Sequence, residues 1–238
     1  ANLSYVDLSE HDLTGTNLIG ATMINTKLSN TSIKGKDLSG ANLSYVDLSE
    51  HDLTGTNLSD TILVGTDLSG RDLQYTQLTN ADFRYANLSE SKLLDSQLTN
   101  NNFDYATLND MNFMGKDLSS SSFNQVKLEG SDMQNTNLSE ASFVQVDLTK
   151  IKNKSLAGAD MTDASFAHAN LSSVNLDDVW LSGTNFWRAE VSGVDFTVVN
   201  RVDYKTGSCV PNMGCEVQGK DPVTGEPREW SMEIPPFV

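Results

Sequence analysis

Apolar residues recur at every fifth position of this chain, a spacing that neither an α-helix nor a flat β-strand produces. Every fifth residue from Leu3 to Leu148 is apolar, and most of these residues are leucine. Helices repeat every 3.6 residues and strands every two. A period of five follows if each unit is a three-residue strand and a two-residue corner, with the first and third residues facing inward. The pattern therefore predicts one continuous core built from many short strands.

The residues around each central leucine fit this unit. First positions are mainly Ala, Thr, Val or Ser, which are small enough to sit beside a leucine. Second positions are often Asp or Asn, and the last two residues are of types that favour turns or solvent. The strict spacing argues against disorder, which the low aromatic content would otherwise suggest. Residues 1–18 are also repeated letter for letter at residues 41–58.

Units such as ANLSY at residues 1–5 and ANLSE at residues 86–90 resemble the A(D/N)LXX repeats of the pentapeptide-repeat family. The resemblance covers about residues 1–198. It implies an all-β fold, a right-handed quadrilateral parallel β-helix with four pentads in each coil. Coils of this size would place the two copies of the duplicated segment two coils apart. About ten coils, stacked about 4.8 Å apart, predict a rod of roughly 45–50 Å.

The phase of the repeat changes after Leu148. Either Ile151–Asn153 is a three-residue bulge between pentads, or two residues have been lost and Ile151 is a pentad centre. The bulge keeps Phe166 and Phe186 on the face of the earlier phenylalanines, so that six of them occupy consecutive coils. We therefore place a bulge at residues 151–153.

The repeat stops near residue 199, and residues 199–238 are predicted to form a non-repeat C-terminal cap over the last coil, near Trp180 and Trp187. This segment contains Cys209 and Cys215, which flank a short loop rich in turn-forming residues. A disulfide between them is predicted, with two unpaired cysteines as the alternative. A disulfide would favour a secreted, lumenal or cell-surface location over a cytoplasmic one.

The sequence offers little for catalysis. His11 and His51 are copies of one position in the duplication, and a catalytic histidine needs a nucleophile or carboxylate arranged around it. We interpret them as structural variants and expect no enzyme activity and no cofactor. No second Cys or His pair has zinc-ligand spacing, so no metal site is predicted. No apolar run approaches the roughly 18 residues of a membrane span.

The charge and the surface columns point to a protein partner. The net charge is −16, and most of it lies in the repeats, which disfavours nucleic acid and anionic membranes and favours a basic protein. The alternative is that the charge only keeps a repeat rod soluble and monomeric. With four pentads in a coil, two columns border one face as a docking strip, although duplication alone could also generate them. The aromatic column is Tyr5, Tyr45, Tyr85 and Tyr105, and the acidic column is Glu10, Glu50, Glu90 and Asp110.

The function that follows is non-catalytic: an acidic solenoid that serves as a structural scaffold or a protein-binding surface. The family resemblance implies an alternative, because some pentapeptide-repeat proteins mimic DNA and bind DNA gyrase or topoisomerase IV. An open end of the helix would also allow two copies to pair as a homodimer.

Overall fold

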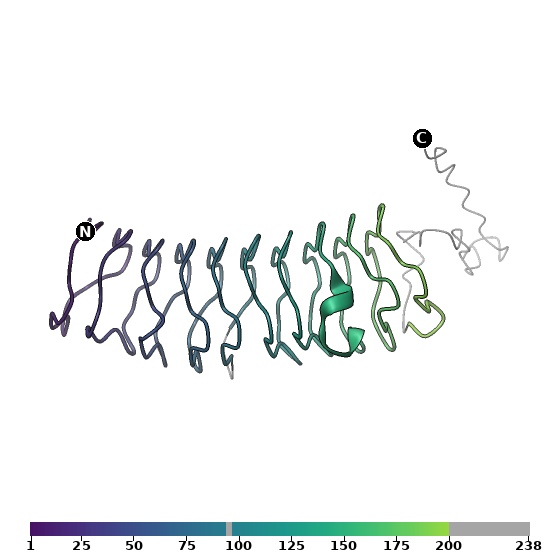
Figure 1. Cartoon of the computed structure of the whole chain (residues 1–238), viewed down its shortest axis with the longest axis horizontal. Coiled ribbons are helices and arrows are strands. Elements are labelled where there is room, and N and C mark those ends of the chain that lie inside the picture. Colours follow the sequence, from purple (N-terminus) through teal and green to yellow (C-terminus); the bar gives the residue numbers. More distant parts are fainter. Residues whose placement is uncertain (94–96, 200–238) are drawn as a thin grey trace, which may run out of the picture.

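The computed structural model describes residues 1–93 and 97–199, which form a rod of stacked coils running from the N-terminus to residue 199 (Figure 1). The predicted all-β solenoid is confirmed. Its only helices within the described residues are two short 3-10 helices, η1 (Leu148–Lys150) and η2 (Lys152–Lys154). Among the described residues, no helix is long and apolar enough to cross a membrane.

Parallel bridges between equivalent residues of successive coils set the register of the rod. Asn2 pairs with Thr22, and Thr22 pairs in turn with Asn42. The backbone N–H of Leu3 donates to the Thr22 carbonyl at 2.7 Å. Each coil therefore holds four pentads, and residues 21–40 and 41–60 are called the second and third coils below.

The central residues of the pentads fill the rod. From Leu13 to Phe186, the central side chains of the described pentads are buried, whereas Leu3 and Leu8 in the first coil are partly exposed. Phenylalanines on one face form a continuous stack, with 4.6–5.8 Å between successive ring centroids. The stack comprises Phe83, Phe103, Phe123, Phe143, Phe166 and Phe186.

Each corner is a tight turn that explains the residues of the repeat. The N–H of Val6 donates to the carbonyl of Leu3 at 3.1 Å. The second-position carboxylate of Asp7 accepts the N–H of Ser9 at 3.0 Å, an Asx turn that recurs along the chain. The fifth residue of most pentads has a positive φ, as the third residue of a type II turn requires.

Small polar residues at first positions are buried without loss of hydrogen bonding. The hydroxyl of Thr26 donates to the Leu3 carbonyl at 2.8 Å, and that of Thr31 donates to the Leu8 carbonyl at 2.6 Å. No buried side-chain polar atom of the described residues lacks a partner. The core therefore accepts Thr and Ser at low cost, because each hydroxyl finds a carbonyl.

Around η1 and η2, bridged residues are separated by three more sequence positions than in the rest of the rod. Asp147, for example, pairs with Asn170. Ile151 is buried there, and the N–H of Lys152 still donates to Ser131 in the preceding coil at 2.9 Å. Ser155 bridges to Asn175 in the following coil. The three additional residues are thus absorbed where the chain changes partners, between Lys152 and Ser155.

Between the second and third coils, the ladder of backbone hydrogen bonds is interrupted on two of the four faces. We call this an open ladder. On the closed faces, the N–H groups of Met23 and Leu38 donate to the carbonyls of the third coil at 2.7 and 2.9 Å. On the open faces, the equivalent N–H groups make no hydrogen bond to the third coil; they belong to Leu28, Asn30 and Ile33.

The side chain of His51 lies at this opening, and its size is the cause that we assign to it. It occupies a first position, where the second coil has the buried Thr31. An imidazole is too large and too polar for the space that Thr31 fills, so it emerges between the coils and remains half-buried. A side chain that leaves the core in this way separates the two backbones beside it.

We expect Phe123→Ala to destabilise the protein by about 3–5 kcal/mol, because it removes a fully buried ring from the middle of the stack. Phe123→Leu is the matched control, since leucine fills the same face at Leu43 and Leu63. Urea denaturation followed by circular dichroism measures both. Equal losses for the two variants would contradict the role given to the stack.

We also expect the amides of Leu28, Asn30 and Ile33 to exchange with deuterium at least tenfold faster than those of Met23 and Leu38. The first three lack the inter-coil bonds that protect the other two, and exchange follows local opening. Residue-resolved hydrogen exchange measures this. Uniform protection around the second coil would contradict an open ladder.

Candidate functional site

All four residues of the predicted aromatic column lie on one corner of the rod, here called the tyrosine corner (Tyr5, Tyr45, Tyr85 and Tyr105). Their exposed fractions are 77%, 58%, 61% and 45%. Each has a φ near +60°, a left-handed conformation that is uncommon for bulky residues. Where other coils place Asn25 or Gly65 at this corner, the same turn forms without an aromatic side chain.

Only one pair of these four tyrosines is in ring contact. Tyr85 and Tyr105 stack with ring centroids 4.9 Å apart, and the amide of Gln125 reaches the Tyr105 hydroxyl at 3.5 Å. Tyr45 lies over Gly65, where an added Cβ would stand 2.5 Å from its Cε1. Glycine is therefore required there for the Tyr45 ring to keep its place.

The predicted acidic column also lies on one corner, here called the acidic corner (Glu10, Glu50, Glu90 and Asp110). All four side chains are exposed. They are aligned along the rod without an ion pair to any described residue. This corner is therefore a line of carboxylates in solvent. Cys209 and Cys215 lie outside the described residues.

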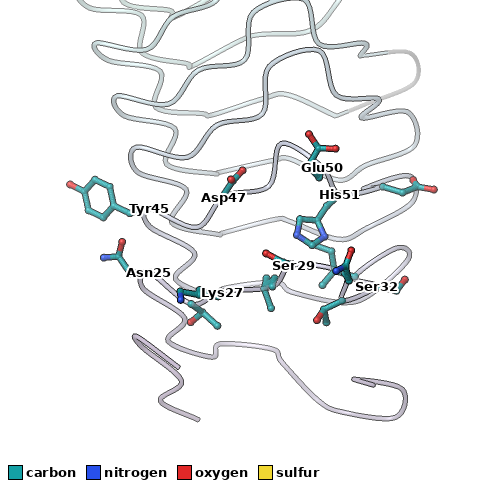
Figure 2. A pocket seen from close by; sticks show the side chains of 14 residues that line it. Asn25, Lys27, Ser29, Ser32, Tyr45, Asp47, Glu50 and His51 are labelled. Carbon is teal, nitrogen blue, oxygen red and sulfur yellow. The ribbon is translucent and has the colours of Figure 1, made fainter. Parts of the chain in front are cut away.

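A groove crosses the face between these two corners at the open ladder of the second and third coils (Figure 2). Its volume is about 650 Å³. Figure 2 shows Tyr45 at one end, the Glu50 carboxylate directed away from the second coil, and the His51 imidazole directed towards it. The labelled lining residues are Asn25, Lys27, Ser29, Ser32, Tyr45, Asp47, Glu50 and His51.

The charges around the groove are mainly negative. Burial lowers the pKa of His51, although the Thr31 carbonyl and Asp47 oppose the shift, so the imidazole is uncharged at pH 7. Hydrogen bonds from Ser49 lower the pKa of Asp47. The Lys34 Nζ, 2.7 Å from Asp52 Oδ2 across the coils, lowers the pKa of Asp52 to about 2.

This arrangement suits recognition rather than bond breaking. Among the described residues, the imidazole of His51 has the Thr31 backbone as its hydrogen-bond partner and no serine hydroxyl, whereas acyl transfer needs a nucleophile bonded to a base. The described residues also contain no group of three His, Cys, Asp or Glu that could hold a metal ion. Polar backbone, hydroxyl and carboxylate groups remain as the means of binding.

Two features of the site were not identified from the sequence. The groove arises from His51, which was interpreted only as a structural variant. The tyrosine corner continues beyond the insertion as His168 and Arg188, and both contact Trp187, by an edge-on ring contact at 4.7 Å and a cation–π contact at 4.6 Å. Carrying the three-residue shift through the corner positions would have found these residues.

Comparisons with known proteins agree with this architecture. The family model for pentapeptide repeats matches in eight copies, over residues 1–35, 25–60, 61–93, 81–115, 117–152 and 155–188. A search of curated proteins found no match.

Among solved structures, the chain is similar to HetL, a pentapeptide repeat protein involved in heterocyst differentiation regulation from the cyanobacterium Nostoc sp. strain PCC 7120. The TM-score is 0.61 at 24% identity, over 85% of this chain and 90% of that chain. A trypsin-treated form of QnrB1, a plasmid-mediated fluoroquinolone resistance protein, aligns with a TM-score of 0.49 at 14% identity, over 78% and 87% of the two chains. The likeness to HetL supports the fold alone. Because the family model spans most of the repeats, the chain belongs to the pentapeptide repeat family, whose fold is a right-handed, four-sided β-helix.

Proposed function

We propose that this protein is a non-catalytic scaffold whose acidic rod binds a protein partner with a basic surface. The binding face lies between the tyrosine corner and the acidic corner. Nothing in this role requires a cofactor or a reacting group, and the rigid stack of coils supplies a long, straight surface.

The observation that carries the proposal is the left-handed conformation of the exposed tyrosines. A non-glycine residue in this conformation costs roughly 1–2 kcal/mol, and the turn itself needs only the glycine or asparagine found in other coils. The turn therefore does not require tyrosine at these corners. Tyrosine is enriched at binding hot spots, where its ring supplies contact area and its hydroxyl a hydrogen bond.

The charge of the rod supports a basic partner. The net charge of the whole chain is −16, and the acidic corner exposes its carboxylates beside the same face. Such a surface raises the rate of encounter with positively charged proteins and disfavours acidic ones, and salt screens both effects.

The same acidic rod favours a second candidate, a mimic of duplex DNA that binds DNA gyrase or topoisomerase IV. A line of carboxylates along a straight solenoid presents negative charge in the way that a phosphate backbone does. The two candidates differ in their target, since the mimic acts on an enzyme that grips DNA.

We expect a variant with Tyr45, Tyr85 and Tyr105 each replaced by asparagine to lose at least tenfold in binding to basic peptides, because hot-spot truncation costs more than about 1 kcal/mol. The probes are Lys- and Arg-containing peptides selected from a random phage-displayed library on the immobilised full-length chain. Thermal stability should change little, since asparagine suits the turn and offsets the loss of the Tyr85–Tyr105 stack.

Tyr75→Asn is the matched control, because Tyr75 is a left-handed tyrosine with 59% exposure on another corner. It should bind like the wild type. Selection of peptides without basic residues, or equal binding by the triple variant, would contradict the proposal.

A gyrase supercoiling assay separates the two candidates. A general scaffold leaves supercoiling unchanged at micromolar protein, whereas a DNA mimic inhibits the enzyme or protects it from poisons. Inhibition that rises with protein concentration and falls with salt would favour the mimic.

A further inference from the structure

We infer that the groove between the second and third coils binds an extended, basic peptide segment of the partner through backbone pairing. This inference rests on the proposed function and names the feature of the partner that the rod recognises.

Unused backbone groups provide the first reason. The N–H groups of Leu28, Asn30 and Asp47 belong to the ladder between these coils, yet none makes an inter-coil hydrogen bond. Unpaired strand edges of this kind are templates for an added strand. Elsewhere in this coil pair, the equivalent groups of Met23 and Leu38 are bonded. These three unused groups therefore lie on the stretch of the two coils that lines the groove.

The dimensions provide the second reason. The groove volume, about 650 Å³, lies within the roughly 300–1,000 Å³ of ligand pockets. It runs along the second coil from Asn25 to Ile33, past the turn at Ser29 and Asn30, and an extended chain advances about 3.3 Å per residue. The straight part of this stretch, between the turns at Asn25 and Ser29, therefore matches a short extended segment.

The chemistry of the rim selects a basic segment. Asp47 and Glu50 stand on the third coil without a lysine or arginine partner among the described residues, whereas Asp52 is already paired with Lys34. Tyr45 forms one end of the groove (Figure 2). Its ring can contact the stem of a lysine or arginine whose charge lies near Asp47.

Fluorescein-labelled peptides test the inference with the full-length protein. The probes are Ac-KVRVKV-NH2, the acidic Ac-EVEVEV-NH2, and a form of the basic peptide that is N-methylated at alternate residues. Only the first should bind, because N-methylation keeps the charge but removes peptide N–H donors that would pair with the carbonyls of Thr26, Asp47 and Ser49, none of which accepts an inter-coil hydrogen bond. We expect at least a tenfold loss on N-methylation. Equal affinity of the methylated peptide would overturn backbone pairing.

The duplication supplies a matched pair of variants. Tyr45→Asn should weaken binding of the basic peptide about tenfold, whereas Tyr5→Asn should not, because Tyr5 has the same neighbours in sequence but does not line the groove. Equal effects of the two substitutions would overturn the location.

His51→Thr tests the groove itself. Threonine is the residue that the second coil buries at this position, so the variant should fold and close the ladder. We expect slower amide exchange at Leu28 and Asn30 and loss of peptide binding. Binding that survives in a variant with newly protected amides would overturn the inference. If exchange at these amides stays unchanged, the opening does not come from His51 and the inference is likewise overturned.

Failure here is distinguishable from failure of the proposed function. If phage-selected basic peptides bind through the tyrosine corner while N-methylation and His51→Thr have no effect, the scaffold stands and the groove does not. If no basic peptide binds the wild-type protein, both are overturned.

Discussion

The whole rod depends on one constraint: each coil must close around four central side chains. A five-residue unit allows this only if a strand of three residues is followed by a two-residue corner whose last residue has a positive φ. The first-position residue then shares the interior with a leucine and must be small. Consequently large residues are tolerated at the corners, where Tyr85 and Tyr105 stack outside the rod, but they disturb the backbone at first positions. Large side chains are therefore accepted on the corners of the rod, whereas at first positions they disturb the hydrogen bonds between coils.

The features predictable from sequence are those that follow from counting residues. Counting four pentads to a coil places Phe83 beneath Phe103 and Tyr85 beneath Tyr105, and both pairs are stacked. Counting residues cannot predict features that depend on how neighbouring side chains compete for the same space. It could not show that Tyr45 leans over Gly65, nor that His51 leaves the core and opens the ladder.

The insertion illustrates the same limit. The phase of the apolar pattern together with the phenylalanine column gives the number of additional residues. Where the chain absorbs them depends on backbone partners, since Lys152 keeps its bond to Ser131 while Ser155 already pairs with Asn175. The buried Asp132 is bonded to Lys152 at 2.9 Å beside this point. Hydrophobic spacing therefore predicts the shift, and backbone partners locate it.

The exact duplication separates what local sequence decides from what stacking decides. His11 and His51 have the same neighbours in sequence, yet His11 is exposed and its Nδ1 lies 2.9 Å from the Ser9 carbonyl, whereas His51 is half-buried between two coils. The difference arises from the second coil, whose Lys27, Ser29 and Ser32 lie opposite the third. Duplication can explain the recurrence of Tyr5 at Tyr45, but it does not reach Tyr85 or Tyr105, which lie outside the copied segment. The tyrosine corner therefore extends beyond the duplicated segment. The groove is formed by two neighbouring coils and cannot be assigned to one short sequence motif.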